Sequence, residues 1–264
     1  MSDISVVLNI TGDGIAQLTI NRPEVHNAFD DDVIEQLISG IKSCETIPSV
    51  RALVLRSNGR NFSAGADLGW MRRMAGNSHD ENLEDARRLA YLMKVLNSFS
   101  KPTVALVQGS AFGGAVGLVA CCDIVIAEFA SRFCLSEVKI GLIPAVISPY
   151  VVRAIGERQA RRYFLTAEPF CARQAQIFGL VHEIVDEADA LDEACERIIA
   201  KLHANSPQAM RAAKELIFSV SQRALDEDVI DDTAQRIADI RASEEGQEGL
   251  GAFLEKRTPT WIGE

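Results

Sequence analysis

The sequence lacks the signals that assign a chain to the membrane, secretory or nucleic-acid-binding classes. None of its apolar runs reaches the roughly 20 residues that a helix needs to cross a bilayer. The N-terminal stretch has neither the basic start nor the long apolar segment of a signal peptide, which predicts a cytoplasmic protein, or an organellar one whose presequence was removed. Positive charge is also scarce, and the net charge of −10 argues against the basic surface that nucleic-acid binding requires.

Metal, redox and nucleotide motifs are missing as well. The six cysteines form no C-x-x-C pair and the four histidines show no metal-ligand spacing, so we expect no metal site. The dinucleotide pattern G-x-G-x-x-G and the P-loop pattern are both absent. Residues 61–65 lack the first glycine of a nucleophile elbow, and no histidine is placed to act as its base, which argues against a serine hydrolase.

The most informative stretch that is present lies between residues 103 and 144. It opens with a short, β-branched apolar run at 103–107, which predicts a buried strand. A glycine turn containing Gly113 and Gly114 follows, and small residues then continue, as expected for a helix packed closely on other backbone. Further along, the carboxylate of Glu137 lies in a mostly apolar segment. A strand, a glycine turn, a helix N-terminus and a carboxylate in apolar surroundings predict an active site.

A second glycine-rich turn, at residues 63–67, also follows a predicted strand, as the turn at 110–114 does. Unpaired backbone N–H groups in such turns bind anionic oxygens, and two of them from separate loops would hold an enolate or a tetrahedral oxyanion. Glu137, held among apolar side chains, would have a raised pKa and would exchange protons near neutral pH. The same residues also suit a helix-packing turn with an exposed glutamate, and the pattern leaves both interpretations open.

Strand and helix patterns alternate over the first ~190 residues, which indicates an α/β fold built from crossover units, and a helical portion follows. Strands are expected at 4–10, 15–20, 51–56, 103–107, 123–127 and 180–185. Helices are expected at 30–41, from about 70 to 99, and at 145–155, 157–166, 172–179, 188–204, 207–222, 225–242 and 247–255. A polar segment at 76–84 is expected to be mobile, as a lid would be. We divide the chain into a core domain at 1–200 and a helical oligomerisation region at 201–264.

Several short segments, spread over the whole chain, form a combination that is typical of one family. They are Asn21-Arg22-Pro23, Asn27-Ala28-Phe29, Phe62-Ser-Ala-Gly-Ala-Asp-Leu68, Lys101-Pro102, Gly109-Ser-Ala-Phe-Gly-Gly114, Cys122-Asp-Ile124, Ser136-Glu137, Gly141-Leu-Ile-Pro144 and Phe253-Leu-Glu-Lys-Arg257. Each alone is a weak signal, but together they are highly specific. On these segments the chain resembles the enoyl-CoA hydratase/isomerase (crotonase) superfamily.

The resemblance implies a crotonase-like spiral of ββα units with a C-terminal helical trimerisation region, and hence a homotrimer or a dimer of trimers. The ligand would be an acyl-coenzyme A thioester, so that coenzyme A is part of the substrate and no separate cofactor is expected. The N–H groups of Ala66 and Gly114 would hold the thioester oxygen, and Glu137 would be the catalytic acid–base. Other substrate-binding positions would be Arg22, Val25, Ala28, Ala64, Gly65, Asp67, Leu68, Gly113, Gly117 and Lys256. Within that set, the backbone at 64–68 would receive the adenine, and the arginine, the 25–28 loop and the lysine would lie near the phosphates and pantetheine.

One departure from the family pattern concerns the mechanism. Typical hydratases of this family carry two glutamates twenty residues apart; the second falls on Glu137, but the first falls on Gly117, which has no side chain. Glu137 is then the only motif-matched acid, and we expect it both to take a proton from water and to return one to C2. The opposing interpretation is that a residue from the 70–90 region replaces the missing glutamate.

The stretches around Gly117 and Glu137 are similar to those of a narrower subgroup. Its members are the methylglutaconyl-CoA hydratases of leucine degradation and the isohexenylglutaconyl-CoA hydratases of acyclic terpene degradation. This similarity predicts a hydro-lyase that adds or removes water across C2=C3 of a branched dicarboxylic enoyl-CoA, such as 3-methylglutaconyl-CoA. Arg72, Arg73 and Lys139 are candidates for the charge that faces the second carboxylate. A single-glutamate enoyl-CoA isomerase is the main alternative, and an acyl-CoA thioester hydrolase or a non-catalytic acyl-CoA-binding protein remain open.

Overall fold

The computed structural model describes residues 4–262, and these form two compact units. The first unit holds the chain up to Phe99 together with Thr103–Glu196, and the second holds Ser100–Pro102 together with the chain from Arg197 onward. Across the described range, no helix combines the length and the apolar character that a membrane span needs.

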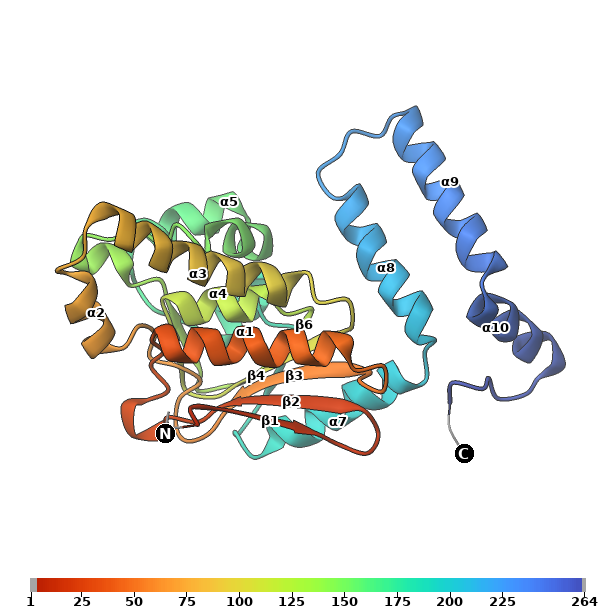
Figure 1. Cartoon of the computed structure of the whole chain (residues 1–264), viewed down its shortest axis with the longest axis horizontal. Helices are drawn as coiled ribbons and strands as arrows, with labels where there is room; N and C mark the ends of the chain where they lie inside the picture. The colour runs from red at the N-terminus through yellow and green to blue at the C-terminus, as the bar shows by residue number, and fades with distance from the viewer. Residues whose placement is uncertain (1–3, 263–264) are drawn as a thin grey trace. The chain divides into compact units, whose positions relative to one another are not determined.

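A six-stranded sheet with the order β1-β2-β3-β4-β6-β9 is the centre of the first unit (Figure 1). Its strands are β1 (Val6–Ile10), β2 (Ile15–Ile20), β3 (Ala52–Ser57), β4 (Thr103–Val107), β6 (Ile124–Glu128) and β9 (Glu183–Val185). The first two strands pair as an antiparallel hairpin, and every other neighbouring pair is parallel. All five residues of β4 are buried, as in a parallel sheet that is covered on both faces. The predicted α/β class is therefore confirmed.

Helices connect the parallel strands. They are α1 (Asp31–Thr46), α2 (Leu68–Met74), α3 (His79–Asn97), α4 (Gly114–Cys121), α5 (Ser148–Thr166) and α6 (Ala172–Phe178). Figure 1 shows α1, α3 and α4 on the same side of the sheet, and α1 contacts both β2 and α3. Asp30 begins α1, because its side chain accepts a hydrogen bond from the N–H of Val33 at 3.0 Å. Gly156 interrupts α5 with a non-helical φ of 75°, where the sequence predicted a break between two helices.

The segment at 76–84, which was expected to be a mobile lid, is mainly the start of α3. Ser78 and Glu81 form a capping box, in which each side chain accepts a hydrogen bond from the backbone N–H of the other residue. Asp80 and Glu81 lie in the first turn, at the positive end of the helix dipole. The polar composition that suggested a loop is therefore that of a capped, solvent-facing helix start.

A small second sheet with the order β5-β7-β8 was not predicted from the sequence. It consists of β5 (Ser110–Phe112), β7 (Arg132–Cys134) and β8 (Phe170–Cys171), and such short strands leave no alternating pattern of their own. The unit also contains two 3-10 helices, η1 (Pro23–Val25) and η2 (Glu137–Ile140). Because β5 pairs with β7, and the N–H of Gly113 donates to the carbonyl of Cys134 at 2.8 Å, the second glycine turn lies beside the segment that carries Glu137.

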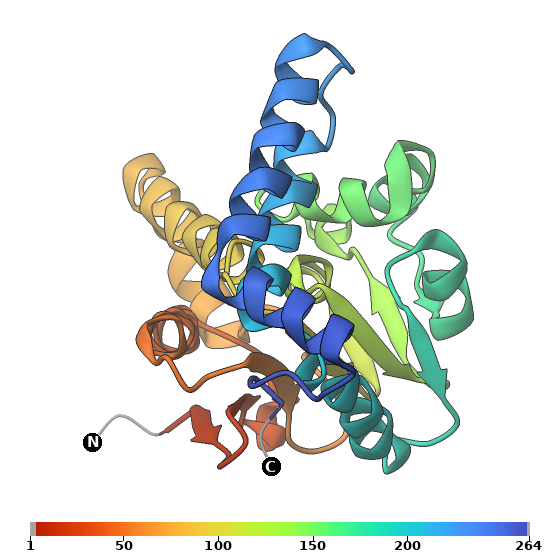
Figure 2. The same cartoon turned by 90° about the vertical axis from the view of Figure 1, so that its right-hand side faces the viewer.

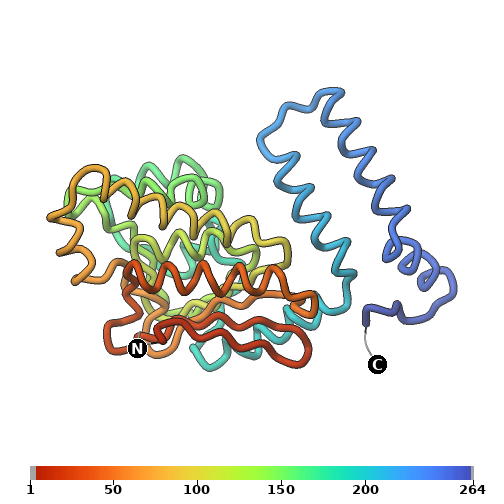
Figure 3. Tube along the Cα trace, viewed as in Figure 1, coloured from red at the N-terminus to blue at the C-terminus, as the bar shows by residue number. Residues whose placement is uncertain are grey.

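The second unit consists mainly of helices (Figures 2 and 3). Helix α7 (Ala190–His203) leads into it from the first unit, and α8 (Pro207–Val220), α9 (Glu227–Ala242) and α10 (Glu244–Glu255) follow. The trace in Figure 3 shows α8 and α9 as a hairpin, and both helices contact α10. Pro207 occupies the first position of α8, as predicted, and Ser206 caps it.

Candidate active site

The two glycine turns that follow β3 and β4 lie side by side. The N–H of Ser63 donates to the carbonyl of Ser110 at 2.9 Å, and the N–H of Phe112 donates to the carbonyl of Ser63 at 3.1 Å. A Cβ on Gly65 would lie 2.9 Å from the carbonyl oxygen of Phe112, and Gly65 has a φ of 94°. Glycine meets both demands, a left-handed backbone and a close approach of neighbouring backbone. The structure thus brings together the two turns that the sequence singled out.

Two backbone N–H groups in these turns are open to a ligand. The residues on either side of Ala66 are bonded to Phe29: Gly65 accepts from its N–H at 2.9 Å, and Asp67 donates to its carbonyl at 3.0 Å. In this parallel bridge, the N–H of Ala66 itself points away from Phe29. Gly114 is the first residue of α4, where the N–H has no intrahelical acceptor. In the described part of the chain neither N–H donates to a protein acceptor, which is what a thioester-oxygen site requires.

The carboxyl group of Glu137 lies next to the second turn. Its Oε1 is 3.4 Å from the position that a Cβ on Gly113 would occupy. Its Oε2 is buried and has no hydrogen-bond partner among the described residues. Burial raises the pKa of Glu137 above its ordinary value. A buried carboxyl oxygen without a partner costs free energy, and groups of this kind cluster at sites where a ligand completes the bonding.

Gly117, one turn along α4 from Gly113, has no room for a side chain. A Cβ there would lie 2.2 Å from Cγ2 of Ile147 and 3.2 Å from Sδ of Met93, and both of these side chains are buried. Ile147 is the N-cap residue of α5, so the contact between α4 and α5 fills the space beside Gly117. Gly117 is therefore buried, and its lack of a side chain allows the close packing of two helices; its contact with substrate stays a prediction.

Arg22, predicted to lie near phosphates, is bonded within the protein. Its Nη1 donates to the carbonyl of Ala28 at 2.8 Å and to Asp30 at 3.1 Å, and its Nη2 donates to Asp67 at 3.4 Å. The hollow beside it, of about 490 Å³, is lined by three carboxylates, whose charge repels phosphate. Through these bonds, the Arg22 side chain connects the loop after β2 with the starts of α1 and α2. Its contact with phosphates stays a prediction.

The other predicted substrate-binding positions are spread over the same loops, with one exception. The exposed positions are Val25, Ala64 and Leu68. Ala28 is buried. Asp67 begins α2 by accepting hydrogen bonds from the N–H groups of Gly69 and Trp70 at 2.7 and 3.1 Å. The exception is Lys256, which belongs to the second unit, where it is exposed and ends α10 in a left-handed conformation.

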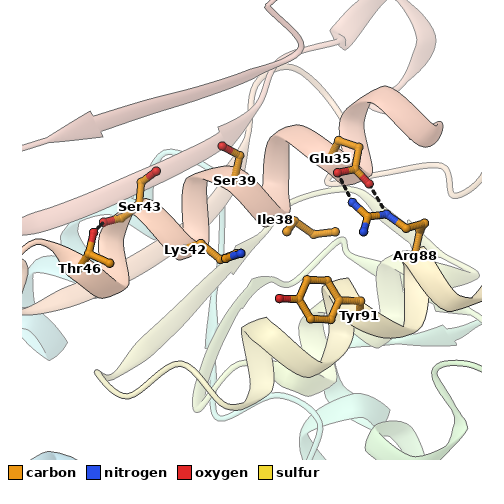
Figure 4. Close-up of a pocket in the computed structure, with 8 residues that line it drawn as sticks. All are labelled: Glu35, Ile38, Ser39, Lys42, Ser43, Thr46, Arg88 and Tyr91. Carbon is orange, nitrogen blue, oxygen red and sulfur yellow. Dashed lines mark hydrogen bonds and ion pairs between the residues drawn. The ribbon is translucent and has the colours of Figure 1, made fainter.

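A separate groove between α1 and α3 contains none of the predicted residues (Figure 4). It has a volume of about 580 Å³ and is lined by Glu35, Ile38, Ser39, Lys42, Ser43, Thr46, Arg88 and Tyr91. Figure 4 shows the guanidinium group of Arg88 paired with the carboxylate of Glu35, and these side chains are 43% and 50% exposed. An exposed ion pair of this kind is typical of a protein surface. We therefore place the candidate site at the glycine turns, where the buried carboxyl lies.

Ile147 was not singled out from the sequence, because an isoleucine near a helix start carries no sign that it packs on a glycine thirty residues earlier. The available signal was Gly117 itself. A glycine inside an apolar helix costs about 1 kcal/mol relative to alanine, which indicates a close neighbour but does not identify it.

Known proteins similar to this chain include a hydratase and an isomerase. The model of the enoyl-CoA hydratase/isomerase family matches residues 11–264. A solved structure of an enoyl-CoA hydratase from Shewanella pealeana has a TM-score of 0.94 and 50% identity, covering 97% of this chain and 96% of that one. The 2,3-dehydroadipyl-CoA hydratase of Escherichia coli is 34% identical, over 93% of this chain and 94% of its own length. The trans-2-decenoyl-(acyl-carrier-protein) isomerase of Streptococcus mutans is 28% identical, over 99% of both chains.

Proposed function

The chain belongs to the enoyl-CoA hydratase/isomerase family, and we propose that it adds water to, or removes water from, the C2=C3 bond of an acyl-CoA thioester. The observation that carries this proposal is the Glu137 carboxyl, which has a raised pKa and a buried, unpartnered oxygen. It lies beside Gly113, in the turn that also presents the open N–H of Gly114. The proton-exchanging carboxyl of Glu137 thus lies beside the same glycine turn that provides the Gly114 oxyanion donor.

In the proposed reaction, ionised Glu137 takes a proton from water while the oxygen of that water bonds to C3. The electron pair of the double bond moves into the thioester, and the N–H groups of Ala66 and Gly114 hold the enolate oxygen. Glu137 then gives its proton to C2, which restores the thioester carbonyl and the carboxylate. One water is consumed for each double bond. The raised pKa of Glu137 suits a group that accepts and returns a proton near neutral pH.

The surroundings of Gly117 support the assignment of both proton transfers to one carboxyl. Ile147 occupies the space into which a side chain at Gly117 would project. In the 70–90 region, Glu81 caps α3 and Asp85 accepts a hydrogen bond from Asn77, so these acids already have structural partners. Hydrogen bonds from Ser78 lower the pKa of Glu81, whereas burial raises that of Glu137.

We further propose that the substrate is a branched dicarboxylic enoyl-CoA, such as 3-methylglutaconyl-CoA. The similarity to the methylglutaconyl-CoA hydratase subgroup supports this. So does the relative that is named for 2,3-dehydroadipyl-CoA, another dicarboxylic enoyl thioester. Of the candidate counter-charges, Arg73 is paired with Asp31, whereas Lys139 is exposed on η2, two residues after Glu137. We assign Lys139 to the second carboxylate of the substrate.

A double-bond isomerase is the second candidate. Moving a proton from C4 to C2 needs one carboxyl and no water, and the filled space at Gly117 fits that chemistry equally well. The relative from Streptococcus mutans is named for an isomerisation. Hydratase and isomerase therefore differ in whether water reaches the double bond, which a product analysis decides.

The test is a panel of enoyl-CoA esters with and without a distal carboxylate. Ultraviolet absorbance follows loss of the conjugated double bond, product mass separates hydration from isomerisation, and a thiol reagent detects hydrolysis. We expect hydration, with the highest kcat/KM for 3-methylglutaconyl-CoA. A higher kcat/KM for crotonyl-CoA contradicts the substrate, and an isomer of unchanged mass contradicts hydration. Free thiol indicates a hydrolase, and tight binding of every ester without turnover indicates an acyl-CoA-binding protein.

We also propose that the protein assembles as a homotrimer or a dimer of trimers. The family resemblance supports this, and so does the surface of the second unit. Ile217 on α8 and Phe253 on α10 are 61% and 81% exposed, and α8 buries none of its residues. Exposed apolar faces of this extent mark interaction surfaces.

A further inference from the structure

A buried asparagine lies where the loop after β2 meets the loop after β3. Asn27 is fully buried, and both it and its neighbour His26 have left-handed backbones, with φ of 54° and 55°. Two successive non-glycine residues in this region are uncommon, and asparagine is among the side chains that tolerate it best. The surrounding structure therefore stabilises this backbone conformation, and the side-chain hydrogen bonds of Asn27 contribute much of that stabilisation.

The Asn27 side chain uses both of its hydrogen-bond donors and one of its acceptor positions across two loops. Its Nδ2 donates to the carbonyls of Asn58 and Asn61, both at 2.7 Å, and its Oδ1 accepts from the N–H of Arg22 at 2.9 Å. We call these three bonds the asparagine clamp. An aspartate would place negative charge against two carbonyl oxygens, and an apolar side chain would leave those carbonyls unpaired, so the clamp needs an amide.

A second asparagine continues the connection to the third loop. Oδ1 of Asn61 accepts a hydrogen bond from the N–H of Ser110 at 3.0 Å. The backbone of Asn61 thus meets the loop after β2, while its side chain meets the loop after β4. Ala66 and Gly114 lie five and four residues beyond these two anchor points, so the clamp connects the segments that carry both oxyanion donors.

We propose that Asn27 is a positioning residue, which sets the N–H of Ala66 relative to that of Gly114 by fixing the spacing of the three loops. This inference rests on the proposed function, because it assigns the clamp to the oxyanion site of that reaction. The bond from the N–H of Ala64 to the carbonyl of His26, at 2.9 Å, transmits the position of the clamp toward Ala66. A small displacement of one donor weakens enolate binding far more than it weakens binding of the coenzyme A portion.

Asn27→Gly is the variant that tests this, because glycine accepts the left-handed backbone and removes only the clamp. The matched control is Asn58→Ala, which removes an exposed bond between the same loops, from Nδ2 of Asn58 to Oδ1 of Asn21 at 2.8 Å. Two ligands are titrated into each protein, free coenzyme A and acetoacetyl-CoA. The ultraviolet enolate band of bound acetoacetyl-CoA reports the oxyanion site directly, and kcat is measured with the best ester of the panel.

We expect Asn27→Gly to weaken the enolate band and to reduce kcat by about 10- to 100-fold, while its affinity for free coenzyme A stays within about threefold of wild type. Asn58→Ala should match wild type in its enolate band, its kcat and its affinity for free coenzyme A. Equal losses of coenzyme A affinity and enolate band in Asn27→Gly, or a wild-type enolate band, would overturn the inference. If Asn27→Gly does not fold, Asn61→Ala breaks the second link and should weaken the enolate band in the same way. A wild-type protein that converts no enoyl-CoA contradicts the proposed function instead, independently of these variants.

Discussion

At the scale of single residues, Glu137 combines a cost in stability with a chemical use. Its Oε2 is buried without a partner in the described chain, and burial raises its pKa. Gly113 beside it bears no Cβ, which leaves the carboxyl next to an open turn. Strain and unpaired polar groups at an active site lower the stability of the fold while they serve its activity. Glu137 is therefore the residue at which stability and activity should respond in opposite directions.

The pH dependence of stability should reveal this trade. Because the pKa of Glu137 is raised above its ordinary value of 4.5, the native state holds this proton more tightly than the unfolded chain does. The resulting stabilisation is complete below that value and is lost as pH rises through the raised pKa. Glu137→Gln cannot ionise, so we expect it to have a higher Tm than wild type at about pH 7 and a similar Tm near pH 4. A lower Tm for Glu137→Gln at neutral pH would contradict burial of an unpaired carboxylate.

Lys139 should set the preference for a second carboxylate. An ion pair with the distal carboxylate of the substrate would be lost in Lys139→Gln, so we expect kcat/KM for 3-methylglutaconyl-CoA to fall about tenfold, as for a charge-assisted hydrogen bond of about 1.5 kcal/mol. The kcat/KM for crotonyl-CoA, which has no such group, should not change. Arg161→Gln removes an exposed cation on α5 that is not a candidate for this contact, and it serves as the control. Equal losses for both substrates in Lys139→Gln would remove Lys139 from the proposal.

At the scale of elements, the contact between α4 and α5 determines what the site can contain. Alanine at Gly117 would favour the helix by about 1 kcal/mol, but its Cβ would lie 2.2 Å from Cγ2 of Ile147, and overpacking of a core costs about 1–3 kcal/mol. The steric term is the larger, because Ile147 is β-branched and buried. We therefore expect Gly117→Ala to be destabilising in spite of its better helix propensity.

A double-mutant cycle measures this contact. Ile147→Ala alone leaves a cavity that costs about 2–5 kcal/mol, whereas in the Gly117→Ala background part of that space is taken up by the new methyl group. We expect the double variant to be more stable than the sum of the two single changes by about 1 kcal/mol or more, as measured by urea unfolding. Additive free energies would show that Ile147 does not occupy the space beside Gly117.

Most of the regular elements were predictable from local patterns, and the contacts between them were not. The strand predicted at 103–107 is β4 at those same residues, because five consecutive apolar or β-branched residues fit a buried strand. The helix after the glycine turn is likewise present, as α4. In contrast, the contact of Ile147 with Gly117 joins residues thirty positions apart, and the bonds from Asn27 to the carbonyls of Asn58 and Asn61 span more than thirty. The sequence could locate the two turns and Glu137, but it could not show which neighbours fill the space around them.

At the scale of the whole molecule, the apolar surface of the second unit is the feature that most requires explanation. Phe253 and Leu254 on α10 are 81% and 77% exposed, and Ile217 and Phe218 on α8 are 61% and 43% exposed. A single copy of the chain would leave these side chains in water, at about 25 cal/mol for each Å² of apolar surface. Burial against other copies of the chain removes that cost.

Light scattering at micromolar concentration should therefore give the mass of three or six chains. Replacing Phe253 and Leu254 with glutamate places charge in the proposed interface, and we expect this double variant to shift toward the monomer and to lose thermal stability. A wild-type monomer at micromolar concentration would contradict the assembly.

The central claim is that Glu137 alone performs both proton transfers, taking a proton from water and giving one to C2. The most direct test is kcat of Glu137→Gln, measured with the ester that wild type hydrates best. Because acid and base are lost together, we expect kcat to fall by at least about 100- to 10,000-fold, with the Kd of the ester within about threefold of wild type. A variant that retains more than about a tenth of the wild-type kcat would show that another residue is the base, and would contradict the account.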